Sequence, residues 1–169
     1  MTITSADFRS CLGCFATGVT VITLDQDGEV HGMTANAFTS VSLDPPLVLV
    51  CINRLSRTYA YLQNKNRFGV NILAEDQKAI SEYYALPANT REKTQRVAVR
   101  FLPTKNGTPM LEGALAQLEC RTHDTQISGD HTIFIAEIEE VQVRKGKPLL
   151  YFCGDYRSIG IAPALSNSE

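Results

Sequence analysis

The sequence lacks the marks of several large classes of protein. No run approaches the ~20 consecutive apolar residues of a membrane-spanning helix. Lys and Arg total 16 against 18 Asp and Glu, which gives a net charge of −2, and they form no basic run of the kind that binds nucleic acid or an anionic membrane. We therefore expect small molecules or proteins as partners, and neither nucleic acid nor a membrane.

Cysteine is sparse and its distribution does not suggest a disulfide framework. The five cysteines are an odd number, and Cys51, Cys120 and Cys153 lie singly inside apolar, strand-like runs. The first residues also lack the positive segment and apolar stretch of a secretory signal. These features predict reduced thiols and a cytoplasmic protein.

The first two cysteines form a C-x-x-C pattern, Cys11-Leu-Gly-Cys14. A thioredoxin-like motif follows a strand and opens a helix, whereas no strand precedes this pair. Cys11 falls on the apolar stripe of a predicted helix beside Phe8 and Phe15, which favours packing over redox chemistry. Because no second pair accompanies it, we expect no metal site.

The usual nucleotide-binding and hydrolytic motifs are missing too. No G-x-G-x-x-G opens a helix, and there is no G-x-x-x-x-G-K-[ST], H-E-x-x-H or G-x-S-x-G. Any nucleotide must therefore be held by something other than a Rossmann fold or a P-loop. A hydrolase is the least favoured class, since no Ser or Cys lies in a nucleophile motif.

What is present is a β-rich chain of 169 residues, with 44% hydrophobic and 20% charged residues, which suits one soluble domain. β-rich and apolar runs bounded by turn residues predict strands at 19–24, 30–34, 38–42, 47–52, 68–73, 114–126, 132–144 and 149–153. Helices are predicted at 7–15, 56–64 and 75–84, and residues 86–100 read as a polar, mobile excursion. Many strands and few helices favour a mainly antiparallel barrel over a βαβ sheet.

Three stretches carry a resemblance to a known family: Gly32-Met-Thr-Ala-Asn-Ala-Phe-Thr-Ser-Val-Ser42, Ala16-Thr-Gly-Val-Thr-Val21 upstream and Gly129-Asp-His131 downstream. With these motifs in this order, the sequence resembles the short-chain flavin reductases, the reductase components of two-component flavin monooxygenases. The resemblance runs from about residue 8 to 156. It implies a mainly β, FMN-binding split β-barrel of Greek-key type, formed by a single domain over residues 1–169, with 157–169 as a C-terminal tail.

A flavin ring presents mostly hydrogen-bond acceptors, so small residues that admit backbone N–H groups suit it. The resemblance assigns Asn36 to the reactive edge of the ring as a catalytic residue. The other ring contacts that it implies are Thr34, Ala35, Ala37, Ser40, Val41, Ser42, Cys51 and Ile52. From the residues alone, 35–37 would more readily be read as a turn, and Ser40 and Ser42 as the polar face of a strand.

The flavin phosphate needs donors, and residues 51–58 pass from an apolar strand into a predicted helix. By resemblance Asn53, Ser56 and Thr58 serve the ribityl and phosphate end, with Arg57 as a further candidate. Ser56 could instead simply cap the helix, which is compatible with phosphate binding at the same end.

A histidine in a loop is by default a solvated side chain. The resemblance gives His131 a catalytic role beside the nicotinamide and brings Tyr156 to the same pocket. His31 and His123 are expected at the surface or the edge of the core.

The resemblance implies an NAD(P)H:flavin oxidoreductase, which reduces FAD or FMN and delivers the reduced flavin by diffusion to a monooxygenase that attacks an aromatic or phenolic compound. It favours FAD and NADH over FMN and NADPH, and it implies a homodimer. Two alternatives remain open: a split-barrel protein that holds FMN tightly as an electron carrier or oxidase, and a non-catalytic dimeric barrel that only binds.

Overall fold

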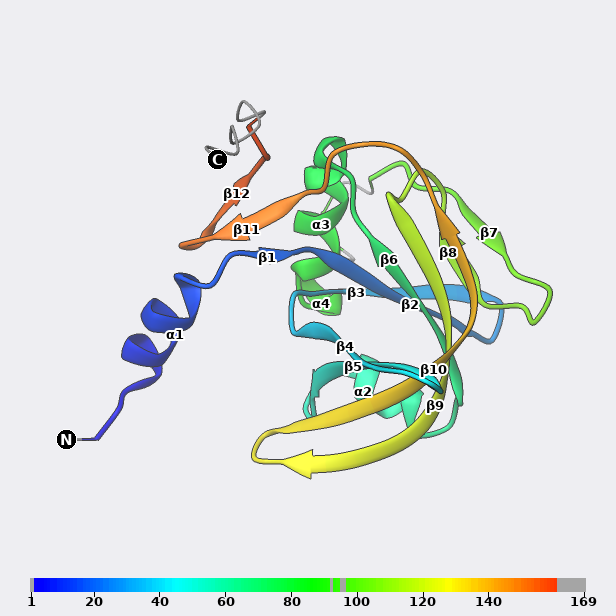
Figure 1. The fold of residues 1–169 in the computed structure, drawn as a ribbon, viewed down its shortest axis with the longest axis horizontal. Helices are drawn as coiled ribbons and strands as arrows, with labels where there is room; N and C mark the ends of the chain where they lie inside the picture. The colour runs from blue at the N-terminus through cyan, green and yellow to red at the C-terminus, as the bar shows by residue number, and fades with distance from the viewer. Residues whose placement is uncertain (1, 92, 95–96, 161–169) are drawn as a thin grey trace, which may run out of the picture.

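The computed structural model describes residues 2–91, 93–94 and 97–160, and its centre is a strongly bent antiparallel sheet (Figure 1). The strand order is β3-β2-β6-β9-β10-β5-β4, so β3 and β4 are free edges and the barrel is split, not closed. The mainly β split barrel that the sequence predicted is confirmed. The strands are β2 (Thr20–Gln26), β3 (Glu29–Ala35), β4 (Phe38–Leu43), β5 (Pro46–Asn53), β6 (Arg67–Ile72), β9 (Ala116–Ser128) and β10 (His131–Val143).

Shorter elements cover the openings of this sheet. A two-stranded sheet consists of β7 (Phe101–Pro103) and β8 (Pro109–Leu111). A three-stranded sheet consists of β1 (Thr17–Gly18), β11 (Leu150–Phe152) and β12 (Asp155–Arg157). The helical segments are α1 (Ser5–Gly13), α2 (Arg57–Leu62), the 3-10 turn η1 (Glu75–Gln77), α3 (Lys78–Ala85) and α4 (Ala88–Arg91).

Turn residues explain the two long hairpins. Asp27 and Gly28 join β2 to β3 with φ of 55° and 88°, the left-handed conformation that an Asp-Gly pair favours in a tight hairpin. Gly129, with φ of 63°, opens the equally short turn between β9 and β10. Both hairpins lie where the sequence predicted strands on either side of a Gly-containing loop.

The structure differs from the sequence prediction in several local features. The first helix begins at Ser5 because Thr4 and Asp7 form a reciprocal capping box. The segment predicted as one helix at 75–84 divides into η1 and α3, and the polar segment 86–100 contains α4. Residues 92 and 95–96 of that segment lie outside the described residues. The short strands β1, β7, β8 and β12 were not predicted.

Two hydrophobic clusters hold the fold together. The larger lies inside the barrel and includes Ile52, Phe68 and Phe134, each at most 1% exposed. The smaller packs α3 and β8 against the start of β2, with Val21 and Leu111 fully buried. On β5 the residues alternate between buried and half-buried, so its second face is turned away from the core.

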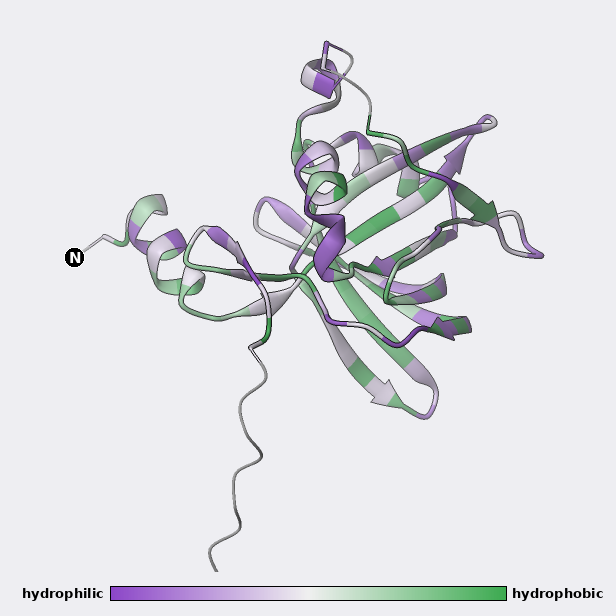
Figure 2. Ribbon diagram, turned by 90° about the horizontal axis from the view of Figure 1, so that it is seen from above, coloured by the Kyte–Doolittle hydropathy of each residue, from purple (hydrophilic) through white to green (hydrophobic). Residues whose placement is uncertain are grey.

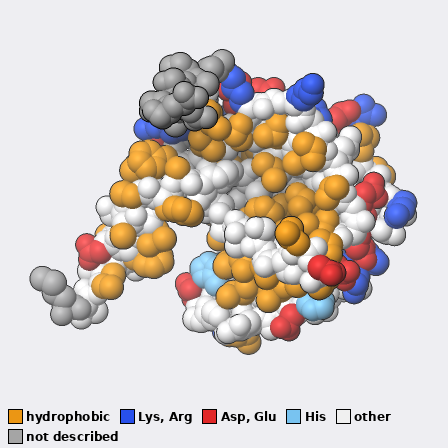
Figure 3. Space-filling view, viewed as in Figure 1, with side chains coloured by type: hydrophobic (Ala, Val, Ile, Leu, Met, Phe, Trp, Pro, Cys, Tyr) orange, Lys and Arg blue, Asp and Glu red, His pale blue; other side chains and the backbone are white. Residues whose placement is uncertain are grey.

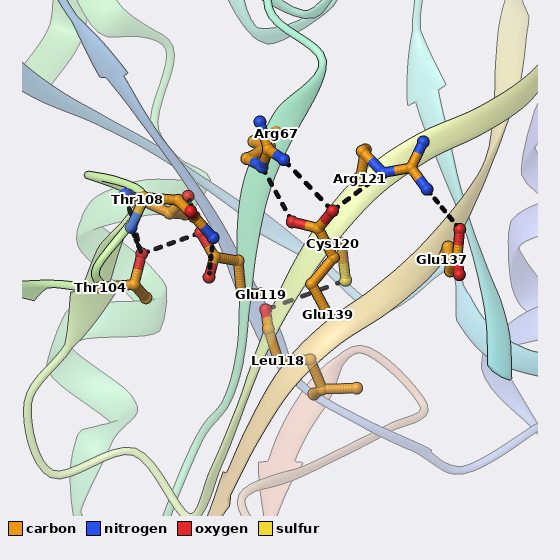
Figure 4. Close-up of polar contacts among 10 residues, drawn as sticks. Arg67, Thr104, Thr108, Leu118, Glu119, Cys120, Arg121, Glu137 and Glu139 are labelled. Carbon is orange, nitrogen blue, oxygen red and sulfur yellow. Dashed lines mark hydrogen bonds and ion pairs between the residues drawn. The ribbon is translucent and has the colours of Figure 1, made fainter.

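A polar network braces the strands β6, β9 and β10 on the barrel wall (Figure 4). Arg67 Nε and Arg121 Nε donate to the Glu139 carboxylate at 2.8 and 2.9 Å, and Arg121 Nη2 donates to Glu137 at 2.5 Å. The hydrogen bond from Arg67 is the largest cause that lowers the pKa of Glu139. Each guanidinium in this network therefore has a carboxylate partner.

Glu119 of β9 lies beside this network and is fully buried. Its carboxylate accepts hydrogen bonds from the Thr108 and Thr104 hydroxyls at 2.6 and 2.8 Å and from the Asn106 amide at 3.1 Å (Figure 4). Several donors offset the cost of removing a carboxylate from water. They attach the β7–β8 loop to the barrel.

Helix α1 stands away from the barrel, and none of its residues is buried (Figures 1 and 2). Phe8 and Phe15 are 58% and 72% exposed, and Cys11 is exposed as well. The packing role predicted for Cys11 is therefore wrong within this chain, because the apolar stripe of α1 meets no part of the barrel. None of the helices among the described residues has the length and apolar character needed to cross a membrane.

Candidate functional site

A cavity of about 600 Å³ opens between β3, the start of α2 and the α3–α4 segment. Its lining comes from three parts of the chain that are far apart in sequence. The residues are His31, Met33, Thr34, Asn53, Leu55, Ser56, Arg57, Thr58, Tyr84, Ala85, Leu86, Pro87, Asn89 and Arg91. Four of the residues predicted for the flavin, Thr34, Asn53, Ser56 and Thr58, are brought together here.

The wall between β3 and α3 depends on a glycine. A Cβ at Gly32 would lie 2.6 Å from the Tyr84 ring, so the absence of a side chain at Gly32 is what lets this ring approach the strand so closely. Two residues further along β3, the Thr34 hydroxyl donates to the Ser81 carbonyl at 2.7 Å. These contacts fix α3 across β3 and set the width of the cavity.

The turn from β5 into α2 is held by its own side chains. Ser56 Oγ accepts from the Tyr59 N–H at 3.1 Å and donates to the Asn53 carbonyl at 2.7 Å. The Asn53 carboxamide oxygen accepts from the Leu55 N–H at 2.8 Å. The predicted N-cap at Ser56 is confirmed, and the same turn presents both polar side chains to the cavity.

His31 and Thr58 form a pair at the base of the cavity. His31 Nε2 lies 2.9 Å from the Thr58 hydroxyl, and its ring packs edge-on against Tyr61. Burial, followed by the charges of Arg91 and Arg57, lowers the pKa of His31 to about 4. The ring is therefore neutral at pH 7, and it was not among the predicted site residues.

Arg91 closes the side of the cavity formed by α4. Its guanidinium carbon lies 5.2 Å from the centre of the Tyr84 ring, and Nη1 donates to the Gly32 carbonyl at 2.8 Å. Arg57 lies on the α2 side. Because none of the described residues that line the cavity is acidic, its electrostatic character suits an anion.

A smaller cavity of about 170 Å³ adjoins the first, with Thr34 and Ala85 lining both. It is formed by Val19, Thr34, Ala35, Asn36, Ser81, Ala85, Tyr151 and Tyr156. The Tyr156 hydroxyl lies 2.8 Å from Ser81 Oγ, and its ring packs edge-on against Tyr151. Asn36 and Tyr156, both predicted for the site, therefore share this cavity.

Four predicted ring contacts lie on or beside the edge strand β4, outside both cavities: Ala37, Ser40, Val41 and Ser42. The Ala37 carbonyl accepts from the Cys51 N–H at 3.0 Å, and Ser42 Oγ accepts from the Asp44 N–H at 3.2 Å. Val41 is 46% exposed. The Ala37 carbonyl and the Ser42 hydroxyl thus stabilise β4 and the turn that follows it.

The two predicted contacts on β5 face opposite ways. Ile52 is fully buried in the barrel core, so its side chain cannot reach a ligand and only its backbone remains as a contact. Cys51 points to the other face, opposite Ile133 of β10. Burial raises the pKa of the Cys51 thiol, which therefore stays protonated at neutral pH.

His131 begins β10 directly opposite Asn53 in the β5–β10 register. Its Nδ1 lies 2.8 Å from the Asp130 carboxylate, and the hydrogen bond from His131 lowers the pKa of Asp130. The Arg54 N–H donates to the Asp130 carbonyl at 3.0 Å, which ties this turn to the end of β5. His131 thus borders the cavity through Asn53 without lining it.

Three lining residues, His31, Tyr84 and Arg91, were not predicted for the site. His31 was expected at the surface or core edge, and Arg91 falls in the polar segment that read as an excursion. A single histidine on a strand is only a weak signal of a site, and the packing of α3 on Gly32 is what brings these side chains together. The described residues contain no group of three or more His, Cys, Asp or Glu that could hold a metal ion.

The sequence of the chain is similar to proteins of one known family. Residues 12–160 match the family described as Flavin reductase like domain. The NADH-dependent flavin reductase of a Rhodococcus species is 40% identical over 160 residues, covering 93% of this chain and 88% of the relative. The reductase component of a 4-nitrophenol 4-monooxygenase/4-nitrocatechol 2-monooxygenase from Rhodococcus opacus is 40% identical, covering 89% and 79%.

Among solved structures, an NADH:FAD oxidoreductase of Streptomyces globisporus in complex with NAD and FAD fragments superposes with a TM-score of 0.84. It is 34% identical, and the match covers 92% of this chain and 93% of that one. The likeness therefore extends over sequence, fold and almost the full length of both chains.

Proposed function

The chain belongs to the flavin reductase like family, and from that premise we propose that it reduces FAD with NADH and supplies the reduced flavin to a partner monooxygenase. The observation that carries the proposal is the pair of adjoining cavities joined at Thr34. One is cationic and lined by no described acid. The other is lined by Asn36, by small residues and by two tyrosines.

The lining fits the two ends of a flavin. The ribityl and phosphate end is assigned to the larger cavity, where Arg57, Arg91 and Thr58 offer charge and hydroxyl partners. The ring edge is assigned to the Thr34–Asn36 side, where small side chains admit backbone donors and Asn36 offers an amide.

A bound flavin supplies the hydride-accepting ring, and the chain supplies position. In this assignment Asn36 holds the ring edge by hydrogen bonding, and the amides around it favour the electron-rich reduced form. No side chain needs to act as a general base. With His31 held neutral by burial, the positive charge facing the phosphates comes from arginine.

His131 is assigned to the nicotinamide. Its Nδ1 faces Asp130, so Nε2 remains to bond the carboxamide and hold the nicotinamide C4 near the ring. Since hydride transfer requires close alignment, His131→Ala should slow flavin reduction by about a hundredfold while leaving flavin affinity unchanged. Stopped-flow reduction across a range of NADH concentrations tests this role. Wild-type rates in the variant would make His131 a solvated residue only.

We further assign a homodimer. The outward face of β5 and β10 pairs half-buried apolar residues, Leu49 with Ile135 and Cys51 with Ile133. Leu43 at the end of β4 is 95% exposed, and the apolar stripe of α1 is bare. Figure 3 shows hydrophobic side chains on α1 and over the barrel that it faces, with a hollow between them. A second copy can cover both. Sedimentation equilibrium tests this, and a monomer at micromolar concentration would refute it.

The function itself is tested by mixing the purified protein with NADH and FAD in the absence of air and following flavin absorbance. Rapid bleaching without an aromatic substrate is the expected result. Running FMN and NADPH in parallel tests the choice of FAD and NADH, which rests on similarity to the Streptomyces globisporus oxidoreductase. An aromatic or phenolic substrate for the partner follows from the nitrophenol relative.

Two outcomes would reject the proposal in different ways. Protein that retains FMN through purification and oxidises NADH slowly would be an electron carrier or oxidase. Colourless protein that never alters flavin fluorescence would be a binding module without reductase activity.

A further inference from the structure

The last turn of helix α1 contacts the tight turn between β11 and β12. Cys153 and Gly154 form this turn with φ of 49° and 81°, between the paired residues Phe152 and Asp155. The Cys153 N–H donates to the Gly13 carbonyl at 2.8 Å. The last turn of α1 and the tip of this hairpin are therefore in backbone contact.

The contact brings the segments of two cysteines together. Cys14 directly follows Gly13, and its thiol, which donates to the Ser10 carbonyl at 3.6 Å, is near enough to Cys153 to contribute to the raised pKa of that thiol. Both cysteines are exposed, and all five cysteines of the chain are free. A Cβ at Gly13 would lie 3.7 Å from the Cys153 Cα, so the backbone one residue before Cys14 is in van der Waals contact with Cys153.

We propose that Cys14 and Cys153 form a reversible disulfide that fastens α1 to the β11–β12 hairpin under oxidising conditions. The hairpin also carries Tyr151 and Tyr156, which line the smaller cavity beside Asn36. Oxidation would therefore anchor the segment that forms one wall of that cavity. Cys11, although it completes the C-x-x-C pattern with Cys14, is not the partner.

Hydrogen peroxide is the oxidant that this role needs. One thiolate attacks a peroxide oxygen, the O–O bond breaks, and a sulfenic acid and one water form. The second thiol attacks the sulfenic sulfur, an S–S bond forms and a second water leaves. Two thiols lose two electrons and two protons, and one peroxide becomes two waters.

The source of peroxide in this scheme rests on the proposed function, because reduced flavin that reaches dioxygen before the monooxygenase yields peroxide. The disulfide itself does not depend on that function. The test therefore uses added peroxide and protein without flavin or NADH, so the two proposals can fail separately.

The experiment treats the full-length protein with peroxide, then maps peptides without reduction and counts free thiols. The expected product is a Cys14–Cys153 cross-linked peptide, loss of two thiols and a melting temperature raised by roughly 5–10 °C because the link closes a long loop. Reduction with dithiothreitol should reverse all three changes. Desolvation and the neighbouring Cys14 thiol raise the pKa of Cys153, so closure should be faster at pH 9 than at pH 7.

Cys14→Ser and Cys153→Ser should each abolish the link, and Cys11→Ser, on the same exposed helix, is the matched control that should retain it. A Cys11–Cys14 peptide, a cross-link whose yield rises with protein concentration, or five unreacted thiols would each overturn the proposal.

Discussion

Arginines gather in two regions of the protein, and the side chains around them differ. On β6, β9 and β10, Arg67 and Arg121 bind the carboxylates of Glu137 and Glu139 at 2.5–2.9 Å. At the cavity, Arg57 and Arg91 share a lining in which no described residue is acidic. The first region joins its arginines to carboxylates and serves the sheet. The second places its arginines on a cavity with no described acid in its lining, where the proposed function puts the flavin phosphate.

Glu119 contrasts most strongly with the cavity, because its buried carboxylate accepts hydrogen bonds from three side chains of the protein. Glu119→Ala removes the acceptor for Thr104, Thr108 and Asn106 and leaves a void, so the free energy of unfolding should fall by about 3 kcal/mol. Urea denaturation measures the change. Glu119→Gln, which keeps one acceptor and the volume, should lose less.

FAD affinity should stay at the wild-type value in folded Glu119→Ala protein. If Glu119→Ala instead weakened FAD binding and left the free energy of unfolding unchanged, the Glu119 network would serve the ligand and not the sheet.

Substitution of Arg91 tests the role of the cavity arginines. Arg91→Ala should raise the dissociation constant of FAD about tenfold, since a charge-assisted hydrogen bond contributes about 1.5–3 kcal/mol and part of that is recovered by solvent. Titration of flavin fluorescence measures it. Arg67→Ala is the matched control, because it removes an arginine of the network and should change flavin affinity little.

Arg91→Lys should bind FAD more tightly than Arg91→Ala, because the positive charge is kept. It should bind FAD less tightly than the wild type, because the bidentate geometry of the guanidinium is lost. Equal losses for Arg67→Ala and Arg91→Ala would remove the distinction between the two regions.

The smallest expected effect is a pH dependence from His31. Its pKa in the folded protein is about 4, below the ~6.5 of an exposed histidine, so the unfolded chain takes up protons first. The contribution of His31 to the free energy of unfolding is fully present above pH 6.5 and is lost as the pH falls toward 4. At pH 5 the loss should be about 1 kcal/mol, a value reduced to allow for the partly exposed ring.

His31→Gln should flatten the stability curve between pH 7 and pH 5, a range above the titration of most carboxylates. Bound FAD should also reduce the slope, because a phosphate near His31 favours the charged ring. If neither His31→Gln nor bound FAD changed the slope of stability against pH, groups other than His31 would cause the pH dependence.

Local patterns in the sequence predicted most of the barrel. The apolar run at 47–52, the β-rich stretch at 132–144, the Asp27-Gly28 turn and the cap at Ser56 are each determined by neighbouring residues, and the strands, turn and cap that they predict are confirmed. The position of α1 off the barrel could not be predicted in this way, since the stripe formed by Phe8 and Phe15 looks the same whether its partner is in the chain or outside it.

The site was predictable only in part, for the same reason. Asn53, Ser56 and Thr58 lie along one turn, and their joint presence at the cavity follows from local sequence. His31 and Arg91 come from segments 60 residues apart, which contact each other through the α3–β3 packing at Gly32. Single-sequence patterns carry no information on that kind of contact.

The pairing of β5 with β10 has a consequence for the order of folding. It joins residues 47–53 to 131–137, whereas the β2–β3 and β9–β10 hairpins join near neighbours. Closing a long loop costs entropy before any contact repays it, so the hairpins should form early and the β5–β10 pairing late. Because Asn53 and His131 meet only in that last step, we expect nascent or partly refolded chains to be unable to reduce flavin, and the return of activity to report completion of the barrel.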